Sequence, residues 1–313
     1  MNFRQSYNLA CKQAIRWFPG HMGKGMKQIE QKLKTIDCII EVHDARVPFS
    51  GRNLQFRESF GTIKPRILVL NKKDLTEVRE QHQTATQIRM KEGIEHVIFT
   101  NCKNQQCKGI QKLVPLTHYL ISNSERYNRT GERDFSIMII GVPNVGKSSL
   151  LNILRNKYLK KKGAAKVGAI AGVTRSVMEK IKICDNPLTY MVDTPGILAP
   201  RIDDDEMGMK LALVGCLKDH LVGEDKIADY LLYWLNRQQL FDYVKLMGLE
   251  KPTDNIIELL ISCANRFGIK RRLKKTDGQV FLVPDLVYAA SFFIKQFRQG
   301  SLGHFNLDKP FEI

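Results

Sequence analysis

The sequence lacks long apolar runs, acidic residues near its start and any regular cysteine pattern. No hydrophobic stretch approaches the roughly 18 residues that a membrane-spanning helix needs. The seven cysteines are odd in number and scattered, which is typical of reduced thiols. Cys102 and Cys107 have no second pair to complete a zinc site. These absences exclude a membrane-spanning helix and a disulfide framework.

Positive charge is what the sequence has in excess. Its 313 residues include 49 Lys and Arg against 32 Asp and Glu, which gives a net charge of +17. A hydrophobic content of 43% is ordinary for a folded protein, and the length suffices for two domains. The charge indicates a polyanionic partner, either nucleic acid or an anionic membrane surface. Because the basic residues cluster, we favour nucleic acid.

A glycine-rich stretch at residues 141–148 (GVPNVGKS) is the strongest local signal. It follows an apolar run rich in β-formers and precedes a segment with helical spacing. Strand, glycine loop and helix are the context of a phosphate-binding P-loop. Backbone N–H groups and the helix N-terminus there favour bound phosphate. In such a loop Lys147 reaches the β- and γ-phosphates, and the Ser148 hydroxyl binds Mg²⁺.

Two further segments predict the base and the reaction. Residues 71–74 (NKKD) close a second apolar run, and residues 193–196 (DTPG) close a third. A carboxylate such as Asp74 can accept hydrogen bonds from guanine N1–H and from the exocyclic amine, a pair that adenine cannot supply. Asp193 would hold Mg²⁺ through a water, and the Gly196 N–H would face the γ-phosphate. The two segments together speak against a P-loop kinase for small substrates.

All three segments stand at the ends of predicted strands. About six strand-like runs alternate with helical stretches, which predicts an α/β fold with a doubly wound, mostly parallel sheet. In such sheets, ligands bind at the carboxyl ends of the strands. The three segments are therefore expected to surround one guanosine triphosphate.

The order of the segments is unusual. Ordinary GTPases have the P-loop first, then DxxG, then NKxD, whereas here NKxD comes first and DxxG last. In this order, and in residues 16–22 (RWFPGHM) and 44–48 (DARVP), the chain resembles the circularly permuted YlqF-type GTPases, a ribosome-assembly group. The resemblance implies a circularly permuted P-loop GTPase domain followed by a small all-α C-terminal domain.

The motifs and the resemblance together give a candidate nucleotide site. By resemblance, residues 100–103 (TNCK) cradle the guanine, and Thr174 in switch I binds Mg²⁺ when the γ-phosphate is present. The candidate GTP-binding residues are Asn71, Lys72, Asp74, Asn101, Cys102, Asn144, Val145, Gly146, Lys147, Ser148, Ser149 and Gly196. The candidate Mg²⁺ ligands are Ser148, Thr174 and Asp193, and the candidate catalytic residues are His21, Lys147 and Thr174.

The intrinsic rate of hydrolysis is expected to be low. Ile197 follows DTPG at the place where other GTPases have a water-orienting Gln, and it cannot hydrogen-bond water. His21 matches the family's candidate catalytic histidine, and an imidazole suits the task of polarising water; a structural role is the alternative. Asn144 matches the asparagine that helps to hold K⁺ in potassium-dependent relatives, but it could equally be a polar loop residue.

We expect three parts in the chain. Residues 1–16 are a short basic segment, either a mitochondrial targeting sequence or an arm that contacts RNA, and no Asp or Glu appears before Glu30. Residues 17–206 form the permuted GTPase domain. Residues 207–313 form a helical domain for RNA or ribosome binding, with an acid-free basic cluster at 266–275.

The resemblance implies a GTP-hydrolysing assembly factor for the mitochondrial large ribosomal subunit. It would bind ribosomal RNA in its GTP state and leave on hydrolysis, which the ribosome would stimulate. The alternative is a non-hydrolysing, GTP-dependent module on RNA or membrane that regulates mitochondrial translation. Mg²⁺ is the expected cofactor, and K⁺ could be a second one. The expected partners are GTP, GDP and the large subunit in the matrix, with peripheral association with the inner membrane left open.

Overall fold

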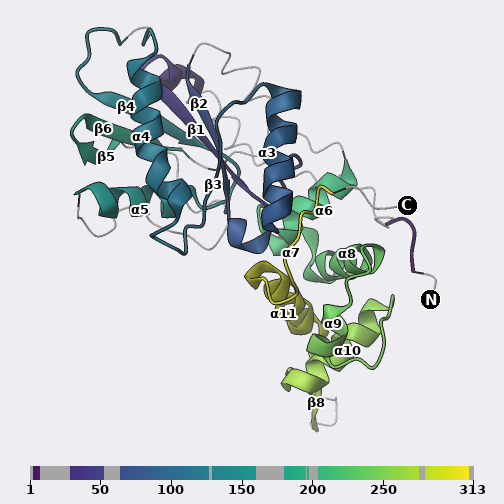
Figure 1. Ribbon diagram of the computed structural model, residues 1–313. Coiled ribbons are helices and arrows are strands. Elements are labelled where there is room, and N and C mark those ends of the chain that lie inside the picture. Colours follow the sequence, from purple (N-terminus) through teal and green to yellow (C-terminus); the bar gives the residue numbers. More distant parts are fainter. Residues whose placement is uncertain are drawn as a thin grey trace. The chain divides into compact units, whose positions relative to one another are not determined.

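The computed structural model describes residues 3–7, 29–52, 64–126, 129–159, 180–194, 196, 204–274 and 279–309. The chain divides into two compact units (Figure 1). The first unit contains the large sheet and takes in Phe305–Asp308 from the far end of the chain. The second unit contains Asp204–His304 together with residues 3–7.

A six-stranded sheet forms the core of the first unit. Its strands lie in the order β3-β2-β1-β4-β6-β5, and all neighbours are parallel except β5 and β6. The predicted α/β fold with a mostly parallel sheet is confirmed. The strands are β1 (Cys38–Asp44), β2 (Arg66–Asn71), β3 (Val97–Phe99), β4 (Phe135–Ile140), β5 (Lys180–Asp185) and β6 (Leu188–Asp193).

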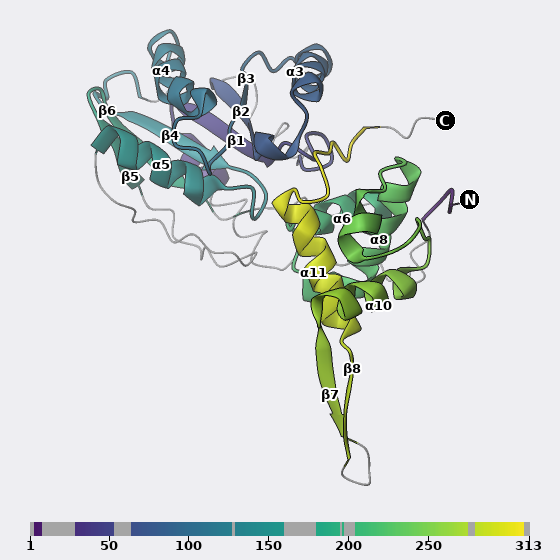
Figure 2. The same ribbon diagram turned by 60° about the horizontal axis from the view of Figure 1, so that its bottom comes forward.

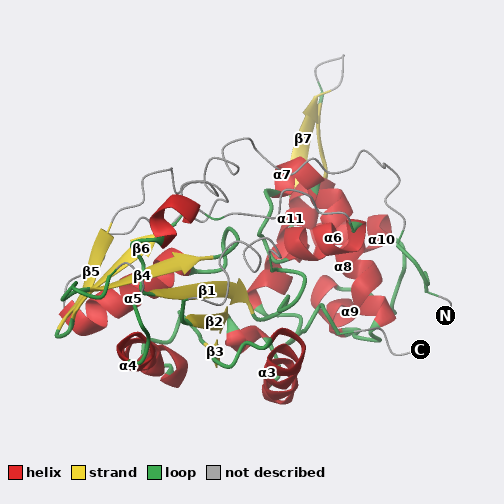
Figure 3. Ribbon diagram, turned by 90° about the horizontal axis from the view of Figure 1, so that it is seen from above, coloured by secondary structure: helices red, strands yellow, loops and turns green. Residues whose placement is uncertain are grey.

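The central strands are almost continuously apolar, and helices cover them. Ile39, Val69 and Ile139 are at most 1% exposed. β-branched residues favour extended backbone, and runs that are apolar on both faces suit a covered parallel sheet. Figure 3 shows the strands in yellow and the helices in red. The helices of this unit include α3 (Val78–Glu92), α4 (Lys108–Ser122), α5 (Lys147–Leu159) and the short 3-10 helix η1 (Lys73–Leu75).

The direction of the strands determines where the site can form. Strands β1, β2, β4 and β6 are mutually parallel, so the loops that follow them leave the sheet at one edge. The NKKD loop follows β2, the P-loop follows β4 and DTPG begins at the end of β6. The three motifs are therefore brought to the same edge although they are far apart in the sequence.

The second unit is mainly helical, as predicted. Tyr230, Leu231 and Trp234 of α8 are at most 2% exposed and form part of its core. The Asn255 side chain caps α10 by accepting from the Ile257 and Glu258 N–H groups. Among the described helices of the chain, none combines the length and the apolar composition that a membrane span needs. The helices are α6 (Asp205–Leu213), α7 (Asp219–Val222), α8 (Glu224–Arg237), α9 (Asp242–Met247), α10 (Ile256–Phe267) and α11 (Leu286–Gln299).

A β-hairpin interrupts the helices of this unit, and the all-α expectation did not include it. Strands β7 (Lys270–Lys274) and β8 (Val280–Pro284) pair antiparallel between α10 and α11. Figure 2 shows the two strands extending beyond the ends of these helices. Every residue of β7 is exposed. A ribbon of only two strands buries little of its own surface, so its basic residues stay in solvent.

The ends of the chain make contacts that the expected division at 16 and 206 did not include. Residues 3–7 pack on the helical unit. The Arg4 guanidinium donates to Asp229 at 2.8 and 3.0 Å and to Asp254 at 3.0 Å. The Tyr7 ring lies against the rings of Tyr230 and Tyr233. Residues 305–308, which were expected in the helical domain, belong instead to the sheet unit.

Candidate functional site

The glycine loop between β4 and α5 has a backbone that depends on its glycines. Gly141 and Gly146 have φ angles of +146° and +102°. A Cβ atom on Gly141 would lie 2.1 Å from the Val42 carbonyl oxygen, and one on Gly146 would lie 2.3 Å from Asn71 Nδ2. Both positions therefore need glycine. The α5 helix begins at Lys147, as the P-loop pattern predicts, so the N–H groups of its first turn adjoin the loop.

The Lys147 side chain folds back onto the carbonyl groups of the P-loop. Its Nζ donates to the carbonyl oxygens of Gly141 and Val142 at 3.1 and 2.9 Å, and the residue is only 7% exposed. A buried ammonium held by loop carbonyls keeps a positive charge at the centre of the loop. This is the charge that the β- and γ-phosphates of a nucleotide require.

Asn71 joins three loops that are distant in sequence. Its Nδ2 donates to the Val145 carbonyl oxygen in the P-loop at 2.8 Å. Its Oδ1 accepts from Thr100 Oγ1 at 3.0 Å and from the Cys102 N–H at 3.2 Å. Asn71 is 2% exposed, so these bonds are shielded from water. The predicted base-reading loop, the predicted guanine cradle and the P-loop are thus held together by one side chain.

The DTPG segment packs against the other side of the P-loop. Ser148 Oγ donates to Asp193 Oδ2 at 3.3 Å, which brings together two predicted Mg²⁺ ligands. The Thr194 hydroxyl donates to the Ile139 carbonyl oxygen at 2.7 Å. A Cβ atom on Gly196 would lie 2.7 Å from Pro143 Cα, so glycine is needed for this approach. The described residues of the DTPG segment therefore lie directly beside the P-loop.

Two buried carboxylate oxygens fit the groups that a guanine nucleotide with Mg²⁺ would offer. Asp74 Oδ1 and Asp193 Oδ1 are buried and lack a hydrogen-bond partner among the described residues. Burial raises the pKa of Asp193, and the charge of Lys147 opposes this shift. A guanine N–H donor would satisfy Asp74, and a water on Mg²⁺ would satisfy Asp193. These two acceptor oxygens therefore suit both groups.

A buried ion cluster supports the loop that is predicted to read the base, and this cluster was not predicted from the sequence. Lys72 has a left-handed backbone (φ 61°), and its Nζ lies 2.9 Å from Asp44 Oδ2. Arg46 donates to both oxygens of the same carboxylate, at 3.0 and 2.8 Å. Burial alone would raise the pKa of Asp44, but Arg46 and Lys72 outweigh it and hold that pKa well below its usual range. In the sequence, Asp44 stood out only as part of residues 44–48, which carry the family resemblance.

The other predicted site residues are placed as follows. Asn144 has a left-handed backbone (φ 59°) in the P-loop, and Ser149 lies in the first turn of α5. Asn101 Oδ1 accepts from the Lys103 N–H at 2.8 Å and so shapes the 100–103 turn. His21, Thr174 and Ile197 lie outside the described residues.

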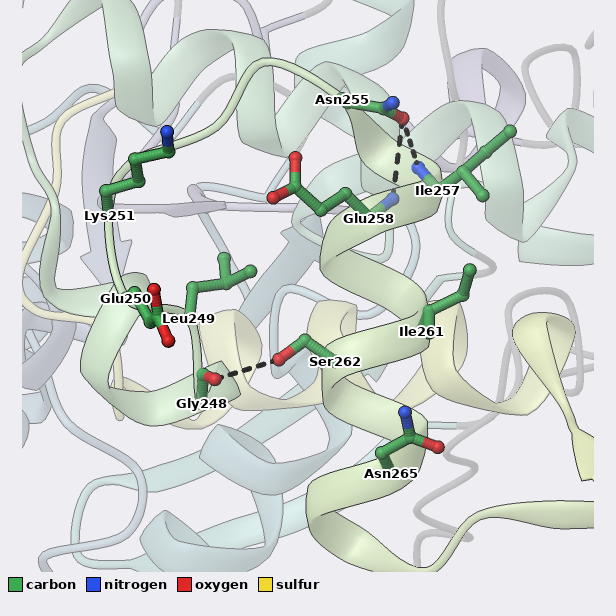
Figure 4. A pocket seen from close by; sticks show the side chains of 10 residues that line it. All are labelled: Gly248, Leu249, Glu250, Lys251, Asn255, Ile257, Glu258, Ile261, Ser262 and Asn265. Carbon is green, nitrogen blue, oxygen red and sulfur yellow. Dashed lines mark hydrogen bonds between the residues drawn. The ribbon is translucent and has the colours of Figure 1, made fainter.

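A separate cleft lies in the helical unit. It has a volume of about 570 Å³ and opens between residues 248–251 and α10 (Figure 4). The Ser262 hydroxyl donates to the Gly248 carbonyl oxygen at 3.0 Å across its floor. None of the predicted nucleotide-site residues lines it. The motif residues meet at the edge of the sheet instead.

Known proteins resemble this chain over nearly its whole length. "Mitochondrial GTPase 1" of Aedes aegypti is 53% identical to this chain, and the alignment covers 98% of this chain and 97% of that protein. "Mitochondrial ribosome-associated GTPase 1" of Bos taurus is 46% identical and is covered to 92%, again with 98% of this chain. "Ribosome biogenesis GTPase A" of Priestia megaterium is 33% identical over 95% of this chain and 98% of its own length.

Two further comparisons agree with the fold. The crystal structure of GNP-bound YlqF from T. maritima superposes with a TM-score of 0.57 at 23% identity, covering 93% of this chain and all of that one. The family described as "50S ribosome-binding GTPase" matches residues 136–261, which leaves NKKD upstream of the match. This placement agrees with the permuted motif order. The chain belongs to the mitochondrial GTPase 1 family, and it is a GTPase with a circularly permuted P-loop domain.

Proposed function

We propose that this GTPase is an assembly factor for the mitochondrial large ribosomal subunit, binding ribosomal RNA with GTP bound and leaving after hydrolysis. The main support for GTP binding is that Asn71 joins three loops, the NKKD loop, the 100–103 turn and the P-loop. The ribosomal part is supported by relatives named as ribosome-associated or ribosome-biogenesis GTPases. Their names also support a mitochondrial location, which we place in the matrix.

Each motif has a distinct task in this proposal. Asp74 reads the guanine, while the Asn101 and Cys102 turn and Lys72 border the base. Lys147, with the N–H groups of residues 144–149, binds the β- and γ-phosphates, and the Gly196 N–H faces the γ-phosphate. Ser148, Thr174 and Asp193 would hold Mg²⁺, which GTPases of this kind use to neutralise phosphate charge.

Hydrolysis would depend on groups other than a glutamine. His21 is proposed to orient the attacking water, and Asn144 to help hold K⁺ beside the phosphates. The left-handed backbone at Asn144 supports its assignment as a special loop position. Phosphate release measured with and without K⁺, and with and without purified large subunits, tests both points. Absence of turnover under all four conditions would favour the alternative, a GTP-dependent binding module without hydrolysis.

The β7–β8 hairpin is the proposed RNA contact of the helical unit. Four of the five residues of β7 are basic: Lys270, Arg271, Arg272 and Lys274. The β8 strand has no acidic residue, and its Val280, Phe281 and Leu282 are 59%, 39% and 63% exposed. Exposed arginines and lysines bind phosphates, and an exposed aromatic ring can stack on an unpaired base. An anionic membrane surface is the other partner that this chemistry fits.

Crosslinking of the GTP-bound protein to RNA tests the hairpin. The double variant R271E/R272E should lose most crosslinks to ribosomal RNA and flatten the salt dependence of binding by about one logarithmic slope unit per lost phosphate contact. The variant K245E/K251E carries the same charge change on exposed residues of the same unit and is the matched control. Equal loss in both variants would mean that only net charge matters. The membrane would be favoured by a different set of results. The native chain would bind cardiolipin-containing vesicles, and R271E/R272E would lose this binding while its crosslinking to RNA stayed unaltered.

A further inference from the structure

The segment Phe305–Asp308 returns from the helical unit to the GTPase unit and binds there; we call it the C-terminal strap. Residues 300–304 join it directly to the end of α11. Phe305 is 4% exposed and Leu307 is fully buried. The strap is therefore an integral part of the GTPase unit, although the helical unit separates it from the rest of that unit in the sequence.

Backbone hydrogen bonds fix the strap to two loops of the nucleotide site. The Phe305 N–H donates to the Leu75 carbonyl oxygen at 2.9 Å, and Leu75 directly follows Asp74. The Leu307 N–H donates to the Arg46 carbonyl oxygen at 2.8 Å. Arg46 lies in the loop after β1, and Leu75 ends η1 in the connection after β2, so the strap bridges these two connections.

A carboxylate locks the other end of the strap. Asp308 Oδ2 accepts from the N–H groups of Phe49 and Ser50 at 2.8 and 2.9 Å, and Oδ1 accepts from the Ser50 hydroxyl. The Asp308 N–H donates to Asn306 Oδ1 at 3.0 Å, which turns the strap toward this contact. Hydrogen bonds to an ionised group are among the stronger ones in proteins. Asp308 is thus the anchor of the strap on the loop after β1.

The two bridged loops carry the ion cluster that holds the base-reading residues. Arg46 binds Asp44 through its side chain and the strap through its carbonyl oxygen. Asp44 in turn holds Lys72, two residues before Asp74. The strap is therefore hydrogen-bonded to Leu75, directly after NKKD. It is also hydrogen-bonded to Arg46, whose side chain binds the carboxylate that pairs with Lys72.

We propose that the C-terminal strap is a positioning element for guanine recognition, which holds Asp74 at the place where it accepts from the base. A bond to the backbone of the next residue limits how far Asp74 can move, and pre-organisation of this kind lowers the entropy lost on binding. The inference rests on the GTPase activity and is independent of the proposed ribosomal function. It makes the strap a link through which the helical unit can affect the release of nucleotide.

The variant Asp308→Ala removes the anchor, and dissociation of labelled GDP and IDP measures the result. Inosine keeps N1–H but lacks the exocyclic amine from which Asp74 would also accept, so IDP has one of the two base contacts missing. We expect GDP to dissociate about tenfold faster, as for the loss of roughly one charged hydrogen bond, and IDP to accelerate by a smaller factor, because only its N1–H contact depends on Asp74. The preference for GDP over IDP should therefore fall.

Two further variants separate positioning from folding. Ser50→Ala removes only one of the bonds to Asp308 and should give a smaller shift in the same direction; it serves if Asp308→Ala does not fold. Glu95→Ala removes a carboxylate that is 86% exposed in the same unit and should leave both dissociation rates unchanged. Equal acceleration of GDP and IDP in Asp308→Ala, or no acceleration of either, would overturn the proposal. The first result would mean general destabilisation, and the second would mean that the strap has no effect on the site.

Discussion

Asp74 is the residue at which base recognition can be tested most directly. We expect Asp74→Asn to lower GTP affinity on the order of a thousandfold, because an amide that replaces the carboxylate cannot accept from both guanine donors. The amide can instead donate to the C2 carbonyl of xanthine, so affinity for XTP should rise. Calorimetry with GTP, XTP and ATP measures the shift. A variant that kept its preference for GTP would show that Asp74 does not read the base.

Gly146 is the residue at which the P-loop and the NKKD loop come closest. In Gly146→Ala a Cβ atom would lie 2.3 Å from Asn71 Nδ2 on a backbone with φ +102°. Either the loop or Asn71 must move, and we expect GTP affinity to fall about 10- to 100-fold through strain of a few kcal/mol. Gly131→Ala places its Cβ atom in open space and is the control in the same binding assay. Equal affinities in the two variants would contradict the close approach.

Most of these residues could be predicted from the sequence because short local motifs mark them. Contacts between residues that are distant in sequence could not be predicted in this way. Lys147, Asp74 and Asp193 were found because glycines and strand ends mark their loops at fixed spacing. Asp44 was noticed only as part of a resemblance, since nothing nearby in the sequence shows that it pairs with Lys72. The same holds for the anchoring of Asp308 on the loop after β1.

At the scale of elements, His118 ties helix α4 to the sheet and gives a pH dependence. Its Nε2 lies 2.9 Å from Thr189 Oγ1 of β6, and its ring stacks edge-on against Phe135. Burial lowers the pKa of His118 below 6.5 in the folded protein. As pH falls below about 6.5, the unfolded chain takes up a proton first, so the free energy of unfolding decreases until the folded pKa is reached.

Urea denaturation between pH 7.5 and 5 measures this contribution. His118→Gln should lose less stability over that range than the native chain does. His82→Gln, at an exposed histidine of α3, should behave like the native chain. If all three proteins lost stability equally, His118 would not be the group responsible.

The packing of residues 3–7 on α8 is a second prediction at this scale. Arg4→Ala leaves Asp229 and Asp254 without their guanidinium, and we expect the helical unit to lose about 1–2 kcal/mol of stability because both carboxylates are only partly exposed. Hydrogen exchange of amides in α8 should accelerate accordingly. Lys245→Ala, at an exposed position of α9, is the control. Unchanged exchange in α8 would mean that the N-terminal residues contribute nothing to this unit.

The β7–β8 hairpin shows why this element escaped sequence analysis. Its first strand (KRRLK) lacks the alternation of apolar and polar residues that identifies a half-buried strand, because both of its faces are exposed. The helical character of the region around it was predicted, since α10 and α11 each bury an apolar stripe. An element whose side chains meet only solvent leaves no periodic signal.

At the scale of the whole molecule, circular permutation changes what the switch segment is attached to. After DTPG the chain passes through residues 197–203 and enters the helical unit at Asp204. The chain returns to the GTPase unit only at the strap. The two connections at the borders of Asp204–His304 are therefore the segment after DTPG, which we propose senses the γ-phosphate, and the strap.

This connectivity predicts that the GTP and GDP forms differ in the placement of the helical unit. We propose that the Gly196 N–H contacts the γ-phosphate, and loss of that contact on hydrolysis should change the connection to the helical unit. Small-angle scattering with a non-hydrolysable GTP analogue and with GDP should therefore give different profiles. Asp74→Asn under the same guanine nucleotides should give one profile, because it binds neither well. Identical profiles for the native chain in both states would show that hydrolysis acts on the partner by some route other than the helical unit.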